Sequence, residues 1–382
     1  MKIILDRDRF ITALAPALGF NISRNTVSYA DGVLLECPGD PELPGTIRIT
    51  SYDLERGMRT SVEAEVVEPG NYIINTQKLM SIVRALPEGK ISITVDDKFR
   101  AIIEGGMSRF EINAGKGEDF PMLPLLFGKK QYTIPQYKMR SLVNGVLYAV
   151  ASNDQRIAFN GAFFKVEGGK LTVVGCDGDR FAVTEIKAPA DDSPDASVII
   201  PAKILTELMK AVKDTDDDMT MMIAQRHVIF VIGAFTYFAR MIDSEYINYA
   251  RIIPEKSEKH SFISLSAFRS AIERAMLVTD DKLGGKAFVK LEFTNDKLIV
   301  TSAATGGSIY EEIPAATDGG DLTIAFNCRY LLDCLRTCPE YVETIKLSMN
   351  GPLMGVCFEN GTALEQSEDD LSFLHFLMPV RN

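Results

Sequence analysis

One unit occurs three times along this chain of 382 residues, and this internal repeat restricts the fold more than any other feature. Its first marker is a short apolar strand that leads directly into a helix. Phe10, Met139 and Phe268 take the same position in the three copies, at an even spacing of 129 residues. The repeat predicts three similar domains in one chain.

A second marker of the repeat is a β-branched strand, then Asn or Pro, then an amphipathic helix, with a spacing of 126 residues both times. Positions four apart on a helix share one face, and here they are apolar in every copy. The aligned pairs are Leu79 and Val83, Leu205 and Met209, and Leu331 and Leu335. Each copy is therefore predicted to pack this second helix on its domain through that face.

Short strands make up most of the rest of each copy. Residues 47–56, 171–180 and 298–307 each read as a β-rich strand followed by a turn, and alternating hairpin patterns recur. Neither strands nor connections are long enough for repeated parallel crossovers. We therefore predict an α+β fold of three domains, each with antiparallel sheets and two helices on one side. Linker-like segments near 117–130 and 252–260 place the domains at residues 1–127, 128–254 and 255–382.

The composition is that of an ordinary globular protein, with 46% hydrophobic and 24% charged residues. No run of about 18 apolar residues occurs, so no transmembrane helix is predicted. The first ten residues lack the features of a signal peptide. The six cysteines form no CxxC pair, which favours free thiols in a reducing compartment. We expect a cytoplasmic protein that needs neither metal nor cofactor.

The charge of the chain is distributed unevenly. Its net charge of −11 argues, as a sum, against a nucleic-acid binder. However, the three second helices carry a basic residue at the same position: Arg84, Lys210 and Arg336. If the three domains surround an axis, these helices form a positively leaning lining that attracts phosphates weakly, while the acidic residues lie in outer loops. The alternative is that each is an ordinary solvated helix residue.

No sequence motif of a nucleotide-binding, metalloprotease or serine-hydrolase site occurs. The most suggestive polar cluster is Asp177 and Asp179, which could bind a metal or act as an acid and base pair. Asp53 occupies the position of Asp177 in the first repeat, and an aspartate between a strand and a glycine usually serves a turn. Cys334 and Cys338 fall on core-facing repeat positions, which favours a packing role for both. No catalytic residue is predicted.

Four segments of the chain carry a family resemblance: MKIILDRD at the start, GEDFPMLP at 117–124, RIAFNGAFFKVEGGKLTVVGCDGDRFAV at 156–183, and FLMPVRN at the end. In this order and spacing, the whole chain resembles the bacterial beta sliding clamp, the processivity subunit of DNA polymerase III. The resemblance implies a head-to-tail homodimeric ring, lined by helices, that encircles duplex DNA without catalysis. It implies as partners the polymerase catalytic subunit, the clamp loader and other proteins that carry a clamp-binding peptide.

In that family, partners insert a short hydrophobic peptide into a pocket between the second and third domains. The positions that match its walls are Arg156, Phe159, Cys176, Gly178, Asp179, Arg180, Phe181, Ile247, Arg251, Ile252, Met378, Pro379, Val380 and Arg381. An apolar surface rimmed by arginine suits a peptide with aliphatic anchors and a carboxylate. The sequence departs from the family pattern at Ala158, Asp179, Ile247 and Asn382, so the resemblance does not define the peptide preference.

Two further sets of residues follow from the resemblance and the repeat. Arg24 matches a basic loop residue that faces DNA, and joins Arg84, Lys210 and Arg336 as the predicted DNA-facing set. Arg100, Phe110, Leu277 and Val278 match the family's dimer seam. Two alternatives stay open at this point: a metal-dependent enzyme that uses the turn at Asp177 and Asp179, and a repeat scaffold that binds protein but not DNA.

Overall fold

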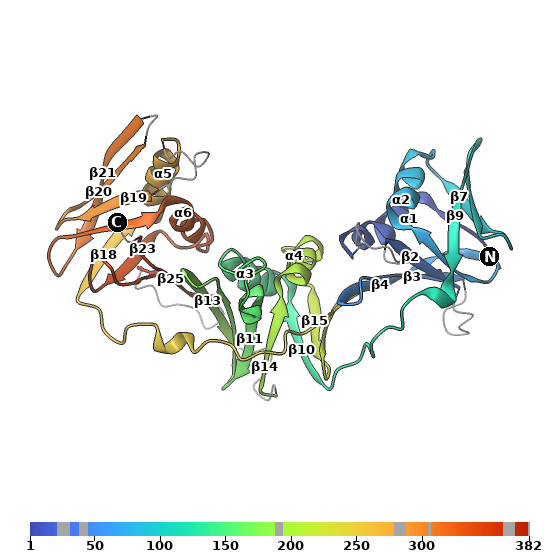
Figure 1. Ribbon diagram of the computed structural model, residues 1–382, viewed down its shortest axis with the longest axis horizontal. Coiled ribbons are helices and arrows are strands. Elements are labelled where there is room, and N and C mark those ends of the chain that lie inside the picture. The colour runs from blue at the N-terminus through green and yellow to red at the C-terminus, as the bar shows by residue number, and fades with distance from the viewer. Residues whose placement is uncertain are drawn as a thin grey trace. The chain divides into compact units, whose positions relative to one another are not determined.

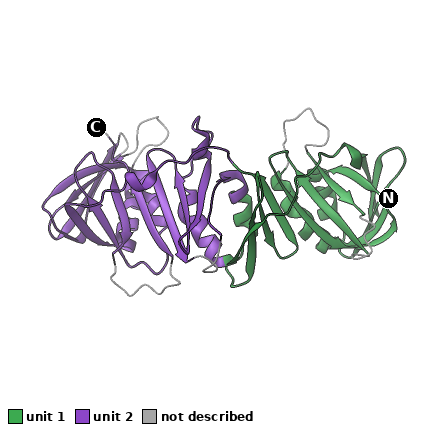
Figure 2. Ribbon diagram, turned by 90° about the horizontal axis from the view of Figure 1, so that it is seen from below, with its two compact units in different colours: residues 1–136, 206–241 green, residues 137–205, 242–382 purple. Residues whose placement is uncertain are grey.

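The computed structural model describes residues 1–20, 31–37, 45–187, 194–278, 288–304, 307–361 and 371–380. The chain divides into two compact units (Figure 2): unit 1 holds Met1–Gln136 and Thr206–Met241, and unit 2 holds Tyr137–Leu205 and Ile242–Asn382. This division passes through the second repeat of the sequence. The three domain boundaries given above stay a prediction.

Unit 1 is built on a sheet with the strand order β10-β15-β16-β17-β4-β3-β2-β6-β9-β8-β7-β1-β5. Its strands are β1 (Lys2–Asp6), β2 (Gly32–Glu36), β3 (Thr46–Tyr52), β4 (Arg56–Glu63), β5 (Glu65–Glu68), β6 (Asn71–Asn75), β7 (Lys90–Val95), β8 (Arg100–Gly105), β9 (Ser108–Lys116), β10 (Lys130–Pro135), β15 (Asp218–Ile223), β16 (His227–Ile232) and β17 (Phe235–Arg240). Helices α1 (Arg7–Leu14) and α2 (Thr76–Ala85) contact each other, and the 3-10 helix η1 (Ala15–Phe20) follows α1 (Figure 1).

Unit 2 has a second sheet, in the order β14-β11-β12-β13-β25-β24-β23-β18-β21-β20-β19-β22. Its strands are β11 (Gly161–Glu167), β12 (Lys170–Cys176), β13 (Arg180–Lys187), β14 (Ala196–Pro201), β18 (Lys259–Ser264), β19 (Phe288–Phe293), β20 (Lys297–Ala304), β21 (Gly307–Thr317), β22 (Leu322–Asn327), β23 (Thr344–Met349), β24 (Val356–Asn360) and β25 (Ser372–Leu377). Its main helices are α3 (Gln136–Leu147), α5 (Leu265–Met276) and α6 (Cys328–Arg336), and α4 (Ala202–Ala211) crosses from unit 2 into unit 1.

The repeat is confirmed at the level of element order. A strand leads directly into a helix at β1–α1, β10–α3 and β18–α5, and again at β6–α2, β14–α4 and β22–α6. The strand pairs recorded in the described residues are antiparallel throughout, for example β3 with β4 and β12 with β13. The predicted α+β plan with two helices per repeat is therefore correct.

The Asn that precedes two of the second helices is an N-cap. The side chain of Asn75 accepts a hydrogen bond from the backbone N–H of Lys78, and Asn327 does the same for Tyr330. Each cap satisfies an N–H group that the first helical turn leaves without a partner. This local chemistry fixes where α2 and α6 begin, and so makes the marker recognisable in the sequence.

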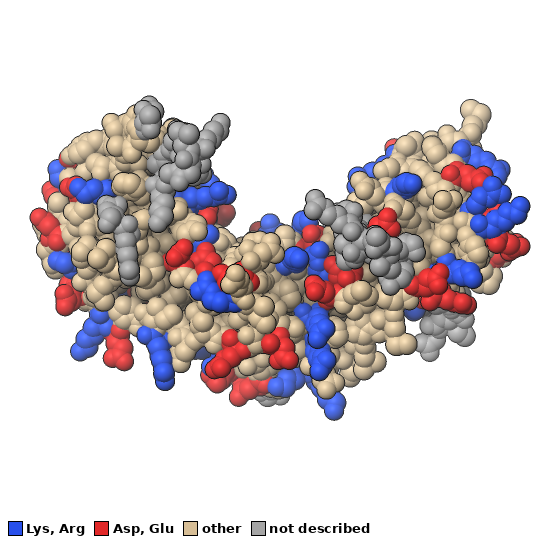
Figure 3. Space-filling model, viewed as in Figure 1, with Lys and Arg blue, Asp and Glu red and all other residues tan. Residues whose placement is uncertain are grey.

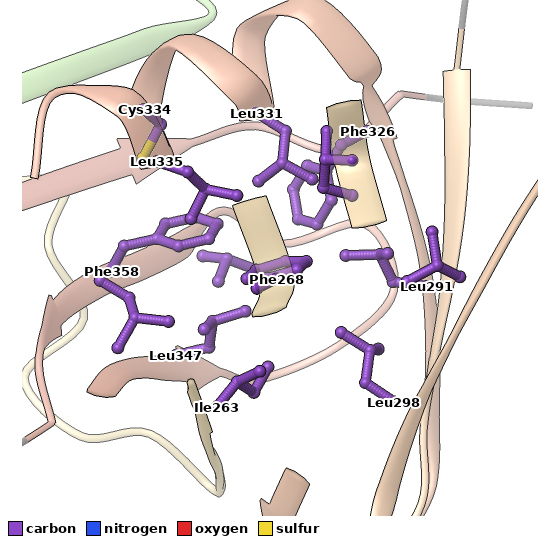
Figure 4. Packing of buried hydrophobic residues seen from close by; sticks show 14 of the residues in the cluster. Ile263, Phe268, Leu291, Leu298, Phe326, Leu331, Cys334, Leu335, Leu347 and Phe358 are labelled. Carbon is purple, nitrogen blue, oxygen red and sulfur yellow. The ribbon is translucent and has the colours of Figure 1, made fainter. Parts of the chain in front are cut away.

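The repeat's marker residues form the cores. Phe10, Met139 and Phe268 are fully buried, and Leu79, Leu205 and Leu331 are too. Figure 4 shows Phe268 of α5 among side chains from α6 and the sheet of unit 2. Two expectations were too strong: Met209 and Cys338 are only half-buried. The other five cysteines are buried, none of the six forms a disulfide, and burial raises the pKa of Cys176 to about 11.

A buried histidine is expected to make the stability of unit 2 depend on pH. His375 on β25 lies fully inside, with its Nδ1 2.8 Å from the hydroxyl of Tyr148, and its Nε2 has no hydrogen-bond partner among the described residues. Burial lowers the pKa of His375 to about 3, whereas in an unfolded chain a histidine has a pKa of about 6.5. Between these values the unfolded chain holds one more proton than the folded one.

Stability is therefore expected to fall as the pH falls from about 6.5 towards 3, and this one group contributes about 1.4 kcal/mol per pH unit. Urea unfolding of wild type and His375→Gln at pH 7, 6 and 5 measures that slope. The variant should be less stable than wild type at pH 7, and its free energy of unfolding should fall less as the pH is lowered. Equal slopes for wild type and His375→Gln would contradict the assignment.

Candidate partner-binding site

An apolar cluster at one end of the unit 2 sheet brings together several residues predicted to receive partner peptides. Its buried members are Ala158, Phe159, Cys176, Phe181, Ile199, Cys357 and Phe376. Tyr246, Ile247, Tyr249 and Ile253 pack against them from the segment that leads into β18. The rings of Phe181 and Phe376 stack with centroids 4.7 Å apart. Neighbouring strands β13 and β25 hold these two rings, because Phe181 pairs with Phe376 in the sheet.

The turn between β12 and β13 forms one edge of this cluster. Oδ1 of Asp177 accepts hydrogen bonds from the backbone N–H groups of Asp179 and Arg180. Gly178 between them has φ +102°, a backbone conformation that side chains with a Cβ rarely adopt. The backbone N–H of Met378 donates to the carbonyl of Asp179 at 2.9 Å, so the C-terminal segment is tied to the turn. The carboxylate of Asp177 thus serves the turn, as its repeat position indicates.

Gly178→Ala tests this turn. An added Cβ would lie 2.8 Å from the guanidinium of Arg156, and the positive φ adds strain, so we expect a loss of about 1–2 kcal/mol. Gly168→Ala is the matched control, because Gly168 also has a positive φ, +59°, but open space around it. The melting temperature and the affinity for peptide should both fall further in Gly178→Ala than in Gly168→Ala. Equal behaviour of the two variants would rule out the close contact with Arg156.

The two arginines of the site have different surroundings. Arg156 is exposed; its Nε and Nη2 donate to the two carboxylate oxygens of Asp154 at 2.9 and 2.8 Å, and it lies 4.3 Å over the ring of Phe159. The hydrogen bonds from Arg156 lower the pKa of Asp154 to about 2. This fork leaves the guanidinium at the surface, where it can meet a ligand carboxylate.

Arg180 is buried instead, with its side chain only 9% exposed. It binds Asp177 and Asp333, each at 3.0 Å, and donates to the carbonyl of Tyr148 at 2.8 Å. A guanidinium with three such partners fixes the position of the turn rather than facing solvent. The prediction grouped Arg156 and Arg180 as one rim; the structure separates them into an exposed and an internal residue.

Exposed apolar side chains surround the cluster. Three of the predicted wall residues are exposed: Arg251, Ile252 and Met378. Three others are half-buried: Ile247, Pro379 and Val380. Val380 is held by a backbone hydrogen bond to Ala325. Arg381 and Asn382 lie outside the described residues.

Three exposed residues beside this cluster were missed by the sequence reasoning. Ile157, in the 3-10 helix η3 (Ile157–Asn160), is 55% exposed next to Ala158 and Phe159. Leu353 and Met354 are exposed in the turn between β23 and β24, and the following Gly355 lies directly against the ring of Phe376. The signal available in the sequence was an apolar pair inside a turn, NGPLMG, where polar residues are usual.

The predicted DNA-facing residues of the second helices are all exposed, but they differ in their partners. Lys210 donates to both oxygens of Glu207 at 2.9 Å, and Arg336 binds Glu273 at 2.9 Å. No ion pair is recorded for Arg84 within the described ranges. Figure 3 shows basic and acidic residues interspersed on the face that it draws. The excess of positive charge on these helices is therefore smaller than the sequence indicated. Arg24 lies outside the described residues.

The predicted seam residues lie on or near two strands, β9 and β21, that each have an open edge. Among the described residues, 108–113 of β9 pair only with β8, and 307–314 of β21 pair only with β20. Phe110 on β9 is 37% exposed, and Leu277, at the end of α5, is 84% exposed. Arg100 on β8 binds Glu111 on β9 at 2.7 Å. An open strand edge with large apolar neighbours is a template for pairing with another chain.

The architecture of this chain is that of solved sliding clamps. The structural match to a DNA polymerase sliding clamp from Bacillus subtilis covers 100% of this chain and 99% of that chain, with a TM-score of 0.92 at 23% identity. The DNA polymerase III subunit beta from Pseudomonas aeruginosa matches with a TM-score of 0.89 at 26% identity, over the whole of both chains. These likenesses define the fold class as a DNA clamp of repeated domains.

The sequence comparisons identify the family. Models of the N-terminal, central and C-terminal domains of the DNA polymerase III beta subunit match residues 1–124, 133–248 and 250–379, in that order. The beta sliding clamp of Escherichia coli K12 is 28% identical and that of Salmonella typhimurium 27%, with complete coverage on both sides. The chain therefore belongs to the DNA polymerase III beta subunit family, the beta sliding clamps. No helix in the described part of the chain is long and apolar enough to cross a membrane.

Proposed function

We propose that two copies of this chain close head to tail into a ring around duplex DNA, and that the ring tethers the replicative polymerase to its template. The observation that carries the proposal is the pair of open strand edges, one on β9 near the start of the chain and one on β21 in its last third. Two different edges on one chain favour a heterologous contact, and closure after two copies leaves neither edge free.

In this proposal DNA is held by topology rather than by tight binding. The paired state of Lys210 and Arg336 suits that role, because a lining with few free cations attracts phosphates without fixing the ring at one site. Arg24 and Arg84 complete the DNA-facing set. The protein performs no catalysis: it raises the effective concentration of the polymerase at the primer end. We place it in the cytoplasm, with three domains bounded near residues 127 and 254.

Partners would dock on the apolar cluster of unit 2. A peptide with aliphatic or aromatic anchors would cover Ile157, Ile252 and Met378, and a carboxylate on the peptide would meet Arg156. The polymerase catalytic subunit, the clamp loader and other proteins with such a peptide would then compete for one surface. Asp179 and Ile247 stand where other residues are commoner in the family, and this difference would change which peptides bind best.

Primer extension on a singly primed circular template tests the function. The polymerase and clamp loader of the same genome are supplied with and without this chain, under single-hit conditions with a trap for released polymerase. Products several-fold longer with the chain present are expected. Unchanged product lengths, with loader ATPase confirmed active, would contradict the proposal.

A further inference from the structure

The turn between β12 and β13 carries more negative than positive charge, and this bears on the peptide that the partner-binding site selects. Its two cations are Arg156 and Arg180. Four carboxylates lie beside them: Asp154, Asp177, Asp179 and Asp333. Two positive and four negative charges leave a surplus of two negative charges at one edge of the apolar cluster. The field of such a surplus decides which charged peptides can approach.

Asp154 takes most of the hydrogen-bonding capacity of Arg156. Its carboxylate accepts bonds from Nε at 2.9 Å and from Nη2 at 2.8 Å, and the carbonyl of Asp177 accepts one more from Nη2 at 3.1 Å. A guanidinium has one N–H on Nε and two on each terminal nitrogen. Among the described residues, no partner is recorded for Nη1. A peptide oxygen can therefore meet Arg156 on one nitrogen only, without the bidentate contact by which arginine selects carboxylates.

Arg180 contributes no positive charge that a peptide could use. Its side chain is 9% exposed, and its guanidinium already binds the carboxylates of Asp177 and Asp333, each at 3.0 Å. Those two side chains are 16% and 32% exposed, so the excess of negative charge around Arg180 lies nearer to solvent than the guanidinium does. The charge at this edge of the site is therefore set by carboxylates.

Asp179 is the fully accessible carboxylate of this turn. It is exposed, and no ion pair or hydrogen bond of its side chain is recorded within the described ranges. Its carbonyl accepts the backbone N–H of Met378 at 2.9 Å, so Asp179 lies beside an exposed apolar residue of the site. The hydrogen bond to Asp154 raises the pKa of Arg156, and the charge of Asp179 adds a smaller effect in the same direction. The carboxylate of Asp179 thus lies close to both Met378 and Arg156.

We propose that Asp179 selects partner peptides that carry a lysine or arginine next to the apolar anchor that covers Met378. This inference rests on the peptide site proposed above and names the charge of its ligand. The cation would pair with Asp179 and reduce the negative surplus of the turn, whereas an acidic residue in the same place would be repelled. Arg251, exposed on the segment before β18, remains available to a carboxylate elsewhere on the peptide.

The experiment uses labelled peptides from the clamp-binding segment of the cognate polymerase, in which each position outside the apolar anchors is in turn lysine or glutamate. Fluorescence anisotropy with the full-length protein at about 50 mM salt measures their affinities. At one position we expect the lysine peptide to bind about five times more tightly than the glutamate peptide. Because the pair is exposed, this difference should shrink at about 0.5 M salt.

Asp179→Lys should reverse the preference, so that the glutamate peptide binds at least as tightly as the lysine peptide. The turn should persist, because it is held by Asp177 and by backbone groups of residue 179 rather than by its side chain. Asp216→Lys is the matched control: it makes the same change in net charge at an exposed position of unit 1 and should keep the wild-type preference. Thermal unfolding checks that each variant folds.

Two results would overturn the inference alone: equal binding of lysine and glutamate peptides at every position, or an unchanged preference in folded Asp179→Lys. Should Asp179→Lys not fold, Asp179→Asn takes its place and should bring the difference down to about twofold; an unchanged difference would count equally against it. Absence of binding by every peptide, the unmodified one included, would instead overturn the peptide site itself and this inference with it.

Discussion

Replacing Leu277 with aspartate is expected to turn the dimer into monomers at micromolar concentration. Leu277 follows the last turn of α5, which packs against the open-edged strand β21, and it is 84% exposed in the single chain. At the proposed seam the variant would bury a carboxylate without a partner. We expect a loss of at least about 3 kcal/mol in association, a weakening of about a hundredfold or more.

Sedimentation velocity between 10 nM and 10 µM measures this loss. Leu125→Asp, which changes an equally exposed leucine of unit 1, is the control and should remain dimeric. Leu277→Asn separates the charge from the lost apolar contact and should fall between wild type and Leu277→Asp. A dimer of unchanged stability in Leu277→Asp, with normal thermal unfolding, would place the seam elsewhere.

Removal of residues 378–382 is expected to weaken partner-peptide binding strongly while the dimer persists. The deletion takes away exposed Met378 and the backbone hydrogen bonds from Met378 to Asp179 and from Val380 to Ala325. Because the predicted seam residues lie on β8, β9 and at the end of α5, dimerisation should not change. A loss of about 2 kcal/mol or more, roughly thirtyfold in affinity, is typical of a central anchor surface.

Fluorescence anisotropy with a labelled peptide from the cognate polymerase measures this affinity. Met378→Asp keeps the backbone hydrogen bonds and should weaken binding nearly as much as the deletion. Met122→Asp, at a still more exposed methionine of unit 1, is the control and should bind normally. Full affinity in both Met378→Asp and the deletion would mean that peptides dock on another surface.

The sequence was most informative where the interactions are local. The Asn caps at Asn75 and Asn327, the four-residue apolar spacing and the alternation along the hairpins are each set by residues a few positions apart. Those patterns are enough to predict the repeated strand–helix order and the antiparallel α+β class. Register between distant strands is not encoded in this way, so the composition of the two sheets had to come from the structure.

The candidate site was predictable only in part, because its surroundings are made by residues far apart along the chain. Arg180 is buried by Asp333, which lies more than 150 positions later, and Arg336 is paired by Glu273 from another helix. Neither pairing leaves a local pattern. By contrast, the pair of Glu207 and Lys210 has a helical spacing of three residues and could have been read from the sequence.

The most direct test of the account is retention on circular and linear plasmid. The chain is loaded by its clamp loader onto nicked circular DNA, separated from free protein by gel filtration in moderate salt, and the DNA is then cut once. The account predicts that the protein stays on the circles and is lost after linearisation, because it slides off the ends. Equal loss from circular and linear DNA, with loading confirmed before the separation, would show that the chain does not close around DNA.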